Sequence, residues 1–208
     1  NQDASDMVSL MTPVVKSLFS DMGMEITSEA MQIHGGYGYT KDQGIEQLYR
    51  DNRITPIYEG TNSIQAIDLV FRKIVNKNGD IIEKYINMMN RDLNESNENL
   101  KPFIKQLKIY IEKLNNFSIW MKEKIKSSKD DANAASNDYL KVLGYVAVGH
   151  SWLKVLEVCY NDYSNNKNFY EDKIQTANFY FNRVLPRVES HFLSASSGSK
   201  YIMDFKFN

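Results

Sequence analysis

The stretch IHGGYGYTKDQGIEQLYRDNRITPIYEGTNSIQ, Ile33 to Gln65, differs in composition from the rest of this 208-residue chain. Its first dozen residues hold four glycines, and near its end one isolated carboxylate, Glu59, stands between an aromatic residue and a glycine. Glycine permits positive φ angles and close approach of a ligand to the backbone, but it also simply ends helices. Glu59 is either a solvated loop carboxylate or a base tuned by its surroundings. Composition alone leaves these interpretations open.

The rest of the chain is typical of an all-α protein. Apolar residues recur mostly at helical spacing, and there are only 10 glycines and 4 prolines. Thr12 followed by Pro13 predicts a helix start, and Gly23 predicts the end of that helix. A further helix is expected after residue 61, where Asn62 and Gln65 resemble a capping box.

The sequence NKNGD at residues 76–80 interrupts the helical pattern and predicts a domain boundary. We expect a first helical unit over residues 1–78 and a second, an antiparallel helical bundle, over residues 79–208. Gly144, Ala147 and Gly149 are small enough to let a neighbouring helix come close. The bundle is predicted from four apolar stripes: Ile82, Tyr85, Ile86 and Met89; Leu100, Phe103, Leu107, Tyr110, Leu114, Phe117 and Met121; Tyr139, Val142, Val146, Leu153 and Leu156; Ile174, Ala177, Phe181, Val184 and Leu185.

Charge and composition argue against several classes of function. The 25 basic and 26 acidic side chains nearly cancel, which gives no reason to expect nucleic acid or an anionic membrane as a partner. No uncharged apolar run approaches the roughly 18 residues that predict membrane insertion. Cys159 has no second cysteine to pair with, which favours a reducing compartment. His150 and His191 lack partners at zinc-ligand spacing, so no metal site is expected. Because the chain opens on Asn1, we expect a piece of a longer protein.

Two ordered motifs carry a resemblance to a known family. The pattern Q-x-x-G-G-x-G occupies residues 32–38, and R-D-x-x-I followed by Y-E-G-T-x-x-I-Q occupies residues 50–65. Over more than forty residues this region resembles the last helical segment of the acyl-CoA dehydrogenases. Near the end of the chain, KIQTANFYFNRVLP and GSKYIM resemble the extra helical domain of the longer bacterial members.

The resemblance implies an FAD-dependent oxidation of an acyl-CoA to its trans-2-enoyl form. In the family the matching glutamate removes the α-proton while the β-hydride passes to the flavin, which implies that Glu59 is the base. Gly60 would lie against the substrate. The residues that match FAD-contacting positions are Thr61, Asn62 and Ser63, together with Gln32, Ile33, His34, Gly35 and Gly36, which reach the flavin of a neighbouring subunit.

The same resemblance sets expectations about partners. It implies a homo-oligomer, a dimer or a tetramer, with an electron-transfer flavoprotein as electron acceptor and a cytoplasmic location in a bacterium rather than the mitochondrial matrix. The family's amino-terminal helical domain and middle β domain are missing here, so these residues alone should be inactive. The alternative hypothesis is a non-catalytic helical module that only mediates oligomerisation.

Overall fold

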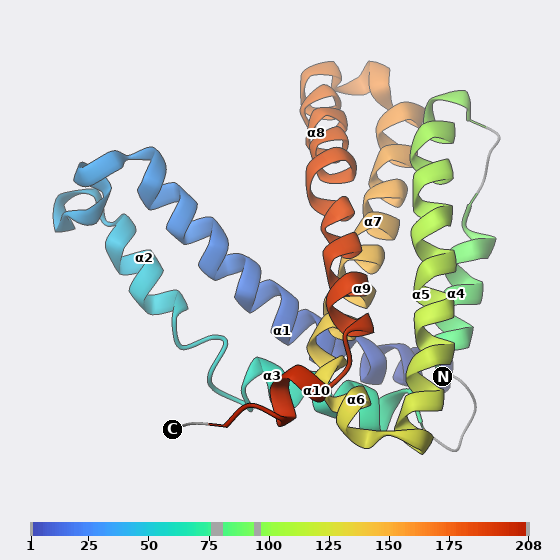
Figure 1. Ribbon diagram of the computed structural model, residues 1–208. Helices are drawn as coiled ribbons and strands as arrows, with labels where there is room; N and C mark the ends of the chain where they lie inside the picture. The colour runs from blue at the N-terminus through green and yellow to red at the C-terminus, as the bar shows by residue number, and fades with distance from the viewer. Residues whose placement is uncertain (1, 76–80, 94–96, 207–208) are drawn as a thin grey trace.

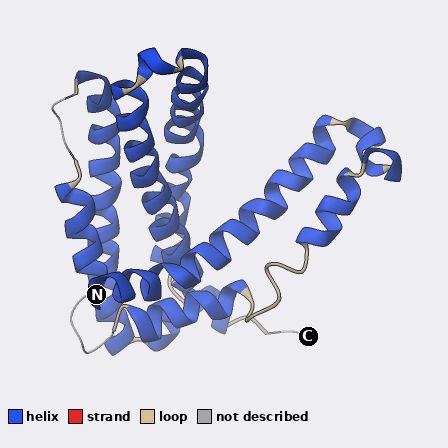
Figure 2. Cartoon of the chain, turned by 180° about the vertical axis from the view of Figure 1, so that it is seen from behind, coloured by secondary structure: helices blue, strands red, loops and turns tan. Residues whose placement is uncertain are grey.

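The computed structural model describes residues 2–75, 81–93 and 97–206, and these residues form helices without any strand (Figure 2). The all-α prediction is therefore confirmed for the part of the chain that is described. The predicted boundary at residues 76–80 lies outside the described residues.

The larger part of the molecule is an upright bundle of helices, seen in Figure 1. It contains α4 (Ile81–Arg91), α5 (Lys101–Ser127), α7 (Ser136–Asn161), α8 (Lys167–Phe179) and α9 (Val188–Ser196). A π-helical turn (Tyr180–Val184) and a 3-10 turn (Leu185–Arg187) connect α8 to α9. The short α6 (Lys129–Ala134) links α5 to α7, and α10 (Lys200–Met203) follows α9.

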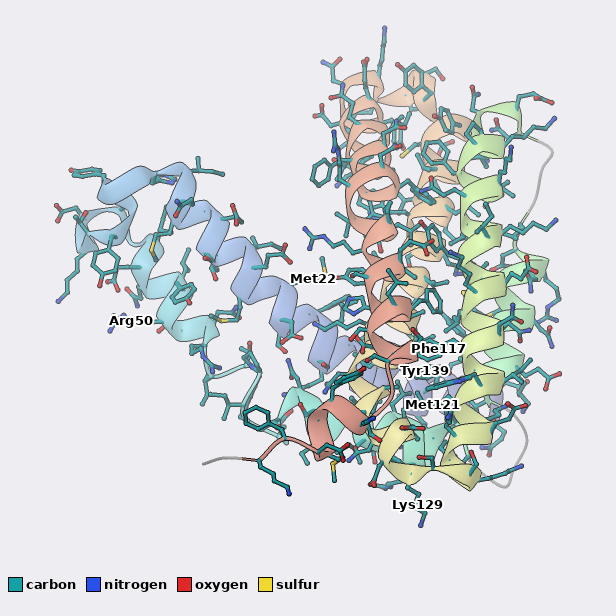
Figure 3. All side chains as sticks on the ribbon, viewed as in Figure 1. Met22, Arg50, Phe117, Met121, Lys129 and Tyr139 are labelled. Carbon is teal, nitrogen blue, oxygen red and sulfur yellow. The ribbon has the colours of Figure 1, made fainter. Side chains whose placement is uncertain are left out.

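The predicted apolar stripes line the core of this bundle. Every residue of the first three stripes is buried, and in the fourth only Ile174 is partly exposed. Figure 3 shows Phe117, Met121 and Tyr139 gathered where α5 faces α7. The rings of Phe117 and Tyr139 lie 5.3 Å apart, and the Tyr139 hydroxyl is 2.8 Å from Ser118 Oγ. The hydroxyl, the one polar atom of this buried side chain, therefore has a hydrogen-bond partner.

The central helix α7 contacts helices on several sides, including α1 (Gln2–Ile33) and α3 (Asn62–Asp68). A Cβ atom on Gly144 would lie 2.7 Å from Leu18 of α1, so this glycine does allow the close helix approach predicted for it. By length and composition α7 could cross a membrane, but 61% of its most apolar window is buried inside the bundle. Core burial therefore accounts for its apolar character.

The predicted helix start at Thr12 and Pro13 is wrong. Helix α1 runs without interruption from Gln2 to Ile33, with Pro13 inside it. An internal proline removes one backbone hydrogen bond and costs about 3 kcal/mol. Burying Leu10 and Leu18, on either side of Pro13, offsets that cost, because each fully buried leucine contributes about 1.5–3 kcal/mol.

The predicted helix end at Gly23 is also wrong, and packing explains the glycine. A Cβ atom on Gly23 would lie 2.8 Å from the side-chain nitrogen of Asn52, the last residue of α2 (Ile45–Asn52). Gly23 therefore lets α2 lie close against α1. Together, residues 22–52 form an arm that leaves the bundle in Figure 1, and Met22 in Figure 3 lies where the arm begins.

The hydrophobic core is continuous across the two predicted units. Leu10 and Val14 of α1 and Ala66 of α3 belong to the same buried cluster as the α5 and α7 core residues. The helix α3 continues through a π-helical turn (Leu69–Lys73), whose Leu69 and Val70 also join this cluster. The division into two domains remains a prediction, but the first unit is packed directly on the second.

Candidate active site

Glu59 occupies an unusual backbone conformation in the connection between α2 and α3. Its φ angle is +54°, and it is the one non-glycine residue with positive φ among the described residues. Gly60 follows with a φ of +82°. A non-glycine residue in this region costs on the order of 1–3 kcal/mol and persists only where its surroundings determine it. Glu59 is exposed, so its carboxylate is open to a partner from outside this chain.

Residues 53–61, which connect α2 to α3 and carry Glu59, are called the Glu59 loop. Three hydrogen bonds hold this loop. Gln65 Nε2 donates to the backbone carbonyl of Glu59 at 2.8 Å. Lys16 Nζ, from α1, donates to the carbonyl of Gly60 at 2.8 Å. The amide of Asn62 donates to the carbonyl of Pro56 at 3.1 Å and closes the loop. These bonds fix the backbone on both sides of Glu59, while its carboxylate remains exposed.

Asn62 does not form the predicted capping box with Gln65, because its side chain turns to α1. Its Oδ1 accepts hydrogen bonds from Lys16 Nζ at 2.8 Å and from Ser20 Oγ at 3.2 Å. Its Nδ2 donates to Asp21 Oδ1 at 2.5 Å and to the carbonyl of Ser17 at 3.1 Å. Lys16 and Asp21 could not be predicted as site residues, since both lie more than forty residues before Asn62 in the sequence.

The two residues beside Asn62 differ in their surroundings. Thr61 precedes the first residue of α3, is exposed, and makes no side-chain capping bond. Ser63 Oγ accepts a hydrogen bond of 3.3 Å from Asn137 of α7. The cofactor contacts expected for these positions remain predictions, and Thr61 is an exposed residue.

The glycine motif lies at the far tip of the arm. Gln32, Ile33 and His34 are exposed where α1 ends, and Gly35 to Tyr39 form a 3-10 helix, η1. Gly35 has a φ of +59°, and neither Gly35 nor Gly36 has an atom within 4 Å of the place where a Cβ would lie. Gly38 differs, because a Cβ there would lie 2.6 Å from the Met31 carbonyl oxygen. Gly35 and Gly36 thus leave the backbone open, whereas Gly38 is needed for packing.

Within one chain the glycine motif and the Glu59 loop are far apart. Lys16 touches the loop, and Gln32 lies sixteen residues further along the same helix. At 1.5 Å per residue this separation is about 24 Å. Figure 1 shows the same arrangement, with the motif at the tip of the arm and the connection to α3 at its base. The structure therefore does not bring these two sets of predicted residues together.

Of the residues predicted to contact FAD, the stretch from Gln32 to Gly36 is accessible to a flavin, whereas the side-chain amide of Asn62 is bonded to α1. Gln32, Ile33 and His34 are exposed, and the adjacent Gly35 and Gly36 offer open backbone. The His34 ring nitrogen Nδ1 lies 3.0 Å from the carbonyl of Ala30, which leaves the other nitrogen directed away from that bond. Over the described ranges, no group of three or more His, Cys, Asp or Glu side chains could hold a metal ion.

Comparison with known proteins assigns both halves of the chain. Residues 1–74 match the family model "Acyl-CoA dehydrogenase, C-terminal domain", and residues 80–206 match "Acetyl-CoA dehydrogenase C-terminal like". The 3-methylmercaptopropionyl-CoA dehydrogenase of Ruegeria pomeroyi is 30% identical over 88% of this chain and 32% of its own length. The butyryl-CoA dehydrogenase of Syntrophomonas wolfei is 27% identical over 89% of this chain and 32% of its own.

A solved structure shares the fold. The crystal structure of Caenorhabditis elegans ACDH-11 in complex with C11-CoA matches with a TM-score of 0.71 and 20% identity, over 100% of this chain and 35% of that one. The chain thus spans about a third of the length of these relatives. With both of its regions matched by models of one family, the chain belongs to the acyl-CoA dehydrogenase family.

Proposed function

We propose that this chain is the carboxy-terminal part of an FAD-dependent acyl-CoA dehydrogenase in which Glu59 removes the α-proton of an acyl-CoA. The observation that supports this most is the conformation of Glu59. Its carboxylate is exposed, its backbone has a positive φ, and its own carbonyl and that of Gly60 accept hydrogen bonds from Gln65 and Lys16. Strained residues cluster at functional sites, and a solvated loop glutamate has no need of such a conformation. Membership of the family supports the reaction class.

The reaction divides between this chain and a bound flavin. The flavin, when bound, accepts the β-hydride of the substrate. Glu59 takes the α-proton on a carboxylate oxygen as the double bond forms, which leaves the trans-2-enoyl product. Lys16 and Gln65 keep the loop backbone in place, so that the carboxylate meets the α-carbon in a fixed orientation. Gly60 follows at a positive φ that glycine adopts without strain, and the family resemblance implies that it lies against the substrate.

We also propose that one active site uses two copies of this chain. The stretch from Gln32 to Gly36 lies about 24 Å along α1 from the Glu59 loop, a distance estimated from the helical rise, and it is exposed. It would meet the flavin of a neighbouring subunit in a dimer or tetramer. An electron-transfer flavoprotein would then reoxidise the flavin. Light scattering that shows an active, flavin-loaded monomer would contradict this arrangement.

The Glu59→Gln variant of the complete protein tests the assignment of the base. The amide keeps the size of the side chain but cannot accept a proton at neutral pH. FAD and acyl-CoA should still bind, while anaerobic flavin reduction slows by a factor on the order of 10²–10⁴. Glu29→Gln, which changes an exposed glutamate on α1, is the matched control and should reduce flavin normally. Near-normal reduction in Glu59→Gln would place the base elsewhere.

A second candidate function rests on the exposed apolar surface of the arm. Ile33 is 83% exposed, Tyr39 77% and Leu48 60%, so the arm offers large apolar side chains that a second copy of the chain would cover. A module that only mediates oligomerisation would use this surface and would not need the conformation of Glu59. Normal assembly together with loss of flavin reduction in Glu59→Gln would separate the enzyme from the module.

A further inference from the structure

The carboxy-terminal region touches the Glu59 loop through a chain of polar contacts. Lys141 of α7 forms an ion pair with Asp21 Oδ2 of α1. The other oxygen of the same carboxylate, Oδ1, accepts the 2.5 Å hydrogen bond from Asn62 Nδ2. Lys141 lies in the region 80–206, whereas Asp21 and Asn62 lie in the region 1–74, so the contacts cross between the two family regions.

We infer that Lys141 is a positioning residue for the Glu59 loop, acting through Asp21 and Asn62. We call these three residues the relay. This inference rests on the proposed function for its effect on catalysis, but the contacts and their effect on the loop do not depend on it.

The chemistry of the four linked groups fixes their orientation. A lysine ammonium can only donate hydrogen bonds and a carboxylate can only accept them. The side-chain amide of asparagine accepts at Oδ1 and donates at Nδ2. Lys16 donates to Asn62 Oδ1, and Asp21 accepts from Asn62 Nδ2. If the side-chain amide of Asn62 rotated by half a turn, its Nδ2 would face the Lys16 ammonium, donor against donor, and its Oδ1 would face the Asp21 carboxylate, acceptor against acceptor. Since Asn62 begins α3 directly after Gly60 and Thr61, its orientation sets where the loop enters the helix.

The link from Lys141 is protected enough from solvent to matter. The side chain of Lys141 is 21% exposed and that of Asp21 is 35% exposed, which separates this pair from fully exposed ion pairs of little effect. Gly144, three residues after Lys141, brings α7 within contact of Leu18 on α1. Asn137, one turn before Lys141, reaches Ser63. One face of α7 thus contacts both α1 and the first turn of α3, the two elements that hold the loop.

Strain at Glu59 explains why such support is needed. A glutamate at positive φ relaxes to ordinary backbone when the contacts that determine it weaken. Without Lys141, the Asp21 carboxylate loses its cation and is free to turn toward solvent and away from Asn62. The loop should then open more often, and the Glu59 carboxylate should spend less time in its productive orientation.

The test uses Lys141→Met in the complete, FAD-loaded protein, because methionine keeps an apolar stem without the charge. Hydrogen exchange of a peptide covering residues 57–66 should quicken by roughly tenfold, the effect of losing one charge-assisted hydrogen bond. Flavin reduction should slow by a similar factor, with FAD content and the Kd of acyl-CoA unchanged. Lys141→Arg should leave the hydrogen exchange of residues 57–66 and the rate of flavin reduction close to those of the wild type, since guanidinium keeps the charge and the donors.

Lys113→Met is the matched control. Lys113 pairs with Glu189 at 2.5 Å within the bundle and does not touch the loop. Asp21→Asn breaks the relay from the other side, and the double variant Lys141→Met with Asp21→Asn should be no worse than the more affected single variant. If Lys141→Met folds poorly, the single variant Asp21→Asn provides the same test.

The outcomes distinguish the relay from the proposed reaction. Unchanged exchange over residues 57–66 in Lys141→Met, or equal increases in Lys141→Met and Lys113→Met, would overturn the relay. Faster loop exchange with undiminished flavin reduction would support the relay and count instead against Glu59 as the base.

Discussion

The side-chain amide of Gln65 donates a hydrogen bond of 2.8 Å to the backbone carbonyl of Glu59, six residues earlier in the chain. The bond joins the first turns of α3 to the residue that precedes the helix by three positions. It ties the carbonyl that joins Glu59 to Gly60, the two residues with positive φ, while Lys16 ties the carbonyl that follows Gly60.

Gln65→Ala should therefore weaken the loop without removing the proposed base, Glu59. A neutral hydrogen bond contributes about 0.5–1.5 kcal/mol, so we expect flavin reduction in the complete protein to slow by roughly 2–13-fold. This loss is far smaller than that expected of Glu59→Gln. Stopped-flow measurement of flavin reduction checks it, with Gln47→Ala, an exposed glutamine on α2, as control. A loss as large as that of Glu59→Gln would contradict a supporting role.

Gly36→Val should lower FAD retention and leave this chain's own fold intact. Nothing lies within 4 Å of a Cβ at Gly36, so the new side chain meets no atom of the same chain. A clash can then come only from a molecule docked on the arm, which we propose to be the flavin of a neighbouring subunit. The flavin-to-protein ratio after gel filtration measures the effect, with Gln43→Val, at an exposed position nearby, as control. Unchanged flavin content in Gly36→Val would contradict the proposal that Gly36 lies against the flavin.

Gly38 would be a poor choice for the same test. A Cβ atom there would lie 2.6 Å from the Met31 carbonyl oxygen, and a substitution would disturb the arm itself. The three glycines of the motif G-G-x-G have different structural roles. Gly35 adopts a positive φ, Gly36 leaves the backbone surface open, and Gly38 allows close contact with Met31.

The helical stripes of the bundle could be predicted from the sequence because burial follows the period of the helix. The ends of α1 could not. Pro13 and Gly23 are local signals for a helix start and end, and here tertiary contacts outweigh them: Leu10 and Leu18 are buried on either side of Pro13, and Asn52 fills the space beside Gly23. Propensity costs of about 1–3 kcal/mol are routinely overridden in this way.

In the candidate site, the sequence predicts the motif residues but not the residues that support them. Glu59 and Gly60 stand next to each other in a recognisable motif, and the family assignment agrees with it. Lys16 and Lys141 carry no local signal, because they reach the loop only after α1 and α7 have packed together. Asn62 matched a local capping pattern, yet its amide bonds to residues of α1 instead.

Gly144→Val should destabilise the protein through the contact between α7 and α1. A Cβ at this position would lie 2.7 Å from Leu18 and 3.2 Å from Val14, both in the core. Overpacking of this kind costs about 1–3 kcal/mol. In a chain of this size each kcal/mol lowers the thermal midpoint by about 2–4 °C. Ser151→Val places the same side chain on the exposed face of α7 and serves as control. Equal midpoints in the two variants would mean that α1 is free to move away from α7.

His150 should make the stability of the bundle depend on pH. Its side chain is 8% exposed, and its Nε2 lies 3.0 Å from Asp92 Oδ2, which Lys154 also contacts at 3.2 Å. Burial lowers the pKa of His150 below its ordinary value of 6.5 and outweighs the hydrogen bond with Asp92, which acts in the opposite direction. The folded state therefore favours the neutral ring.

The direction of the pH effect follows from that lowered pKa. As pH falls below about 6.5, the unfolded chain binds a proton at His150 before the folded chain does. The stabilisation is therefore complete above the unfolded-state pKa and is lost as pH falls through the folded-state pKa. We expect the wild-type thermal midpoint to exceed that of His150→Gln by more at about pH 7.5 than at about pH 5.5. Midpoints of both proteins across this range check it, and comparing the difference cancels the titration of other groups. An advantage that grows toward low pH would instead show that the charged pair with Asp92 dominates, and that His150 is protonated in the folded bundle.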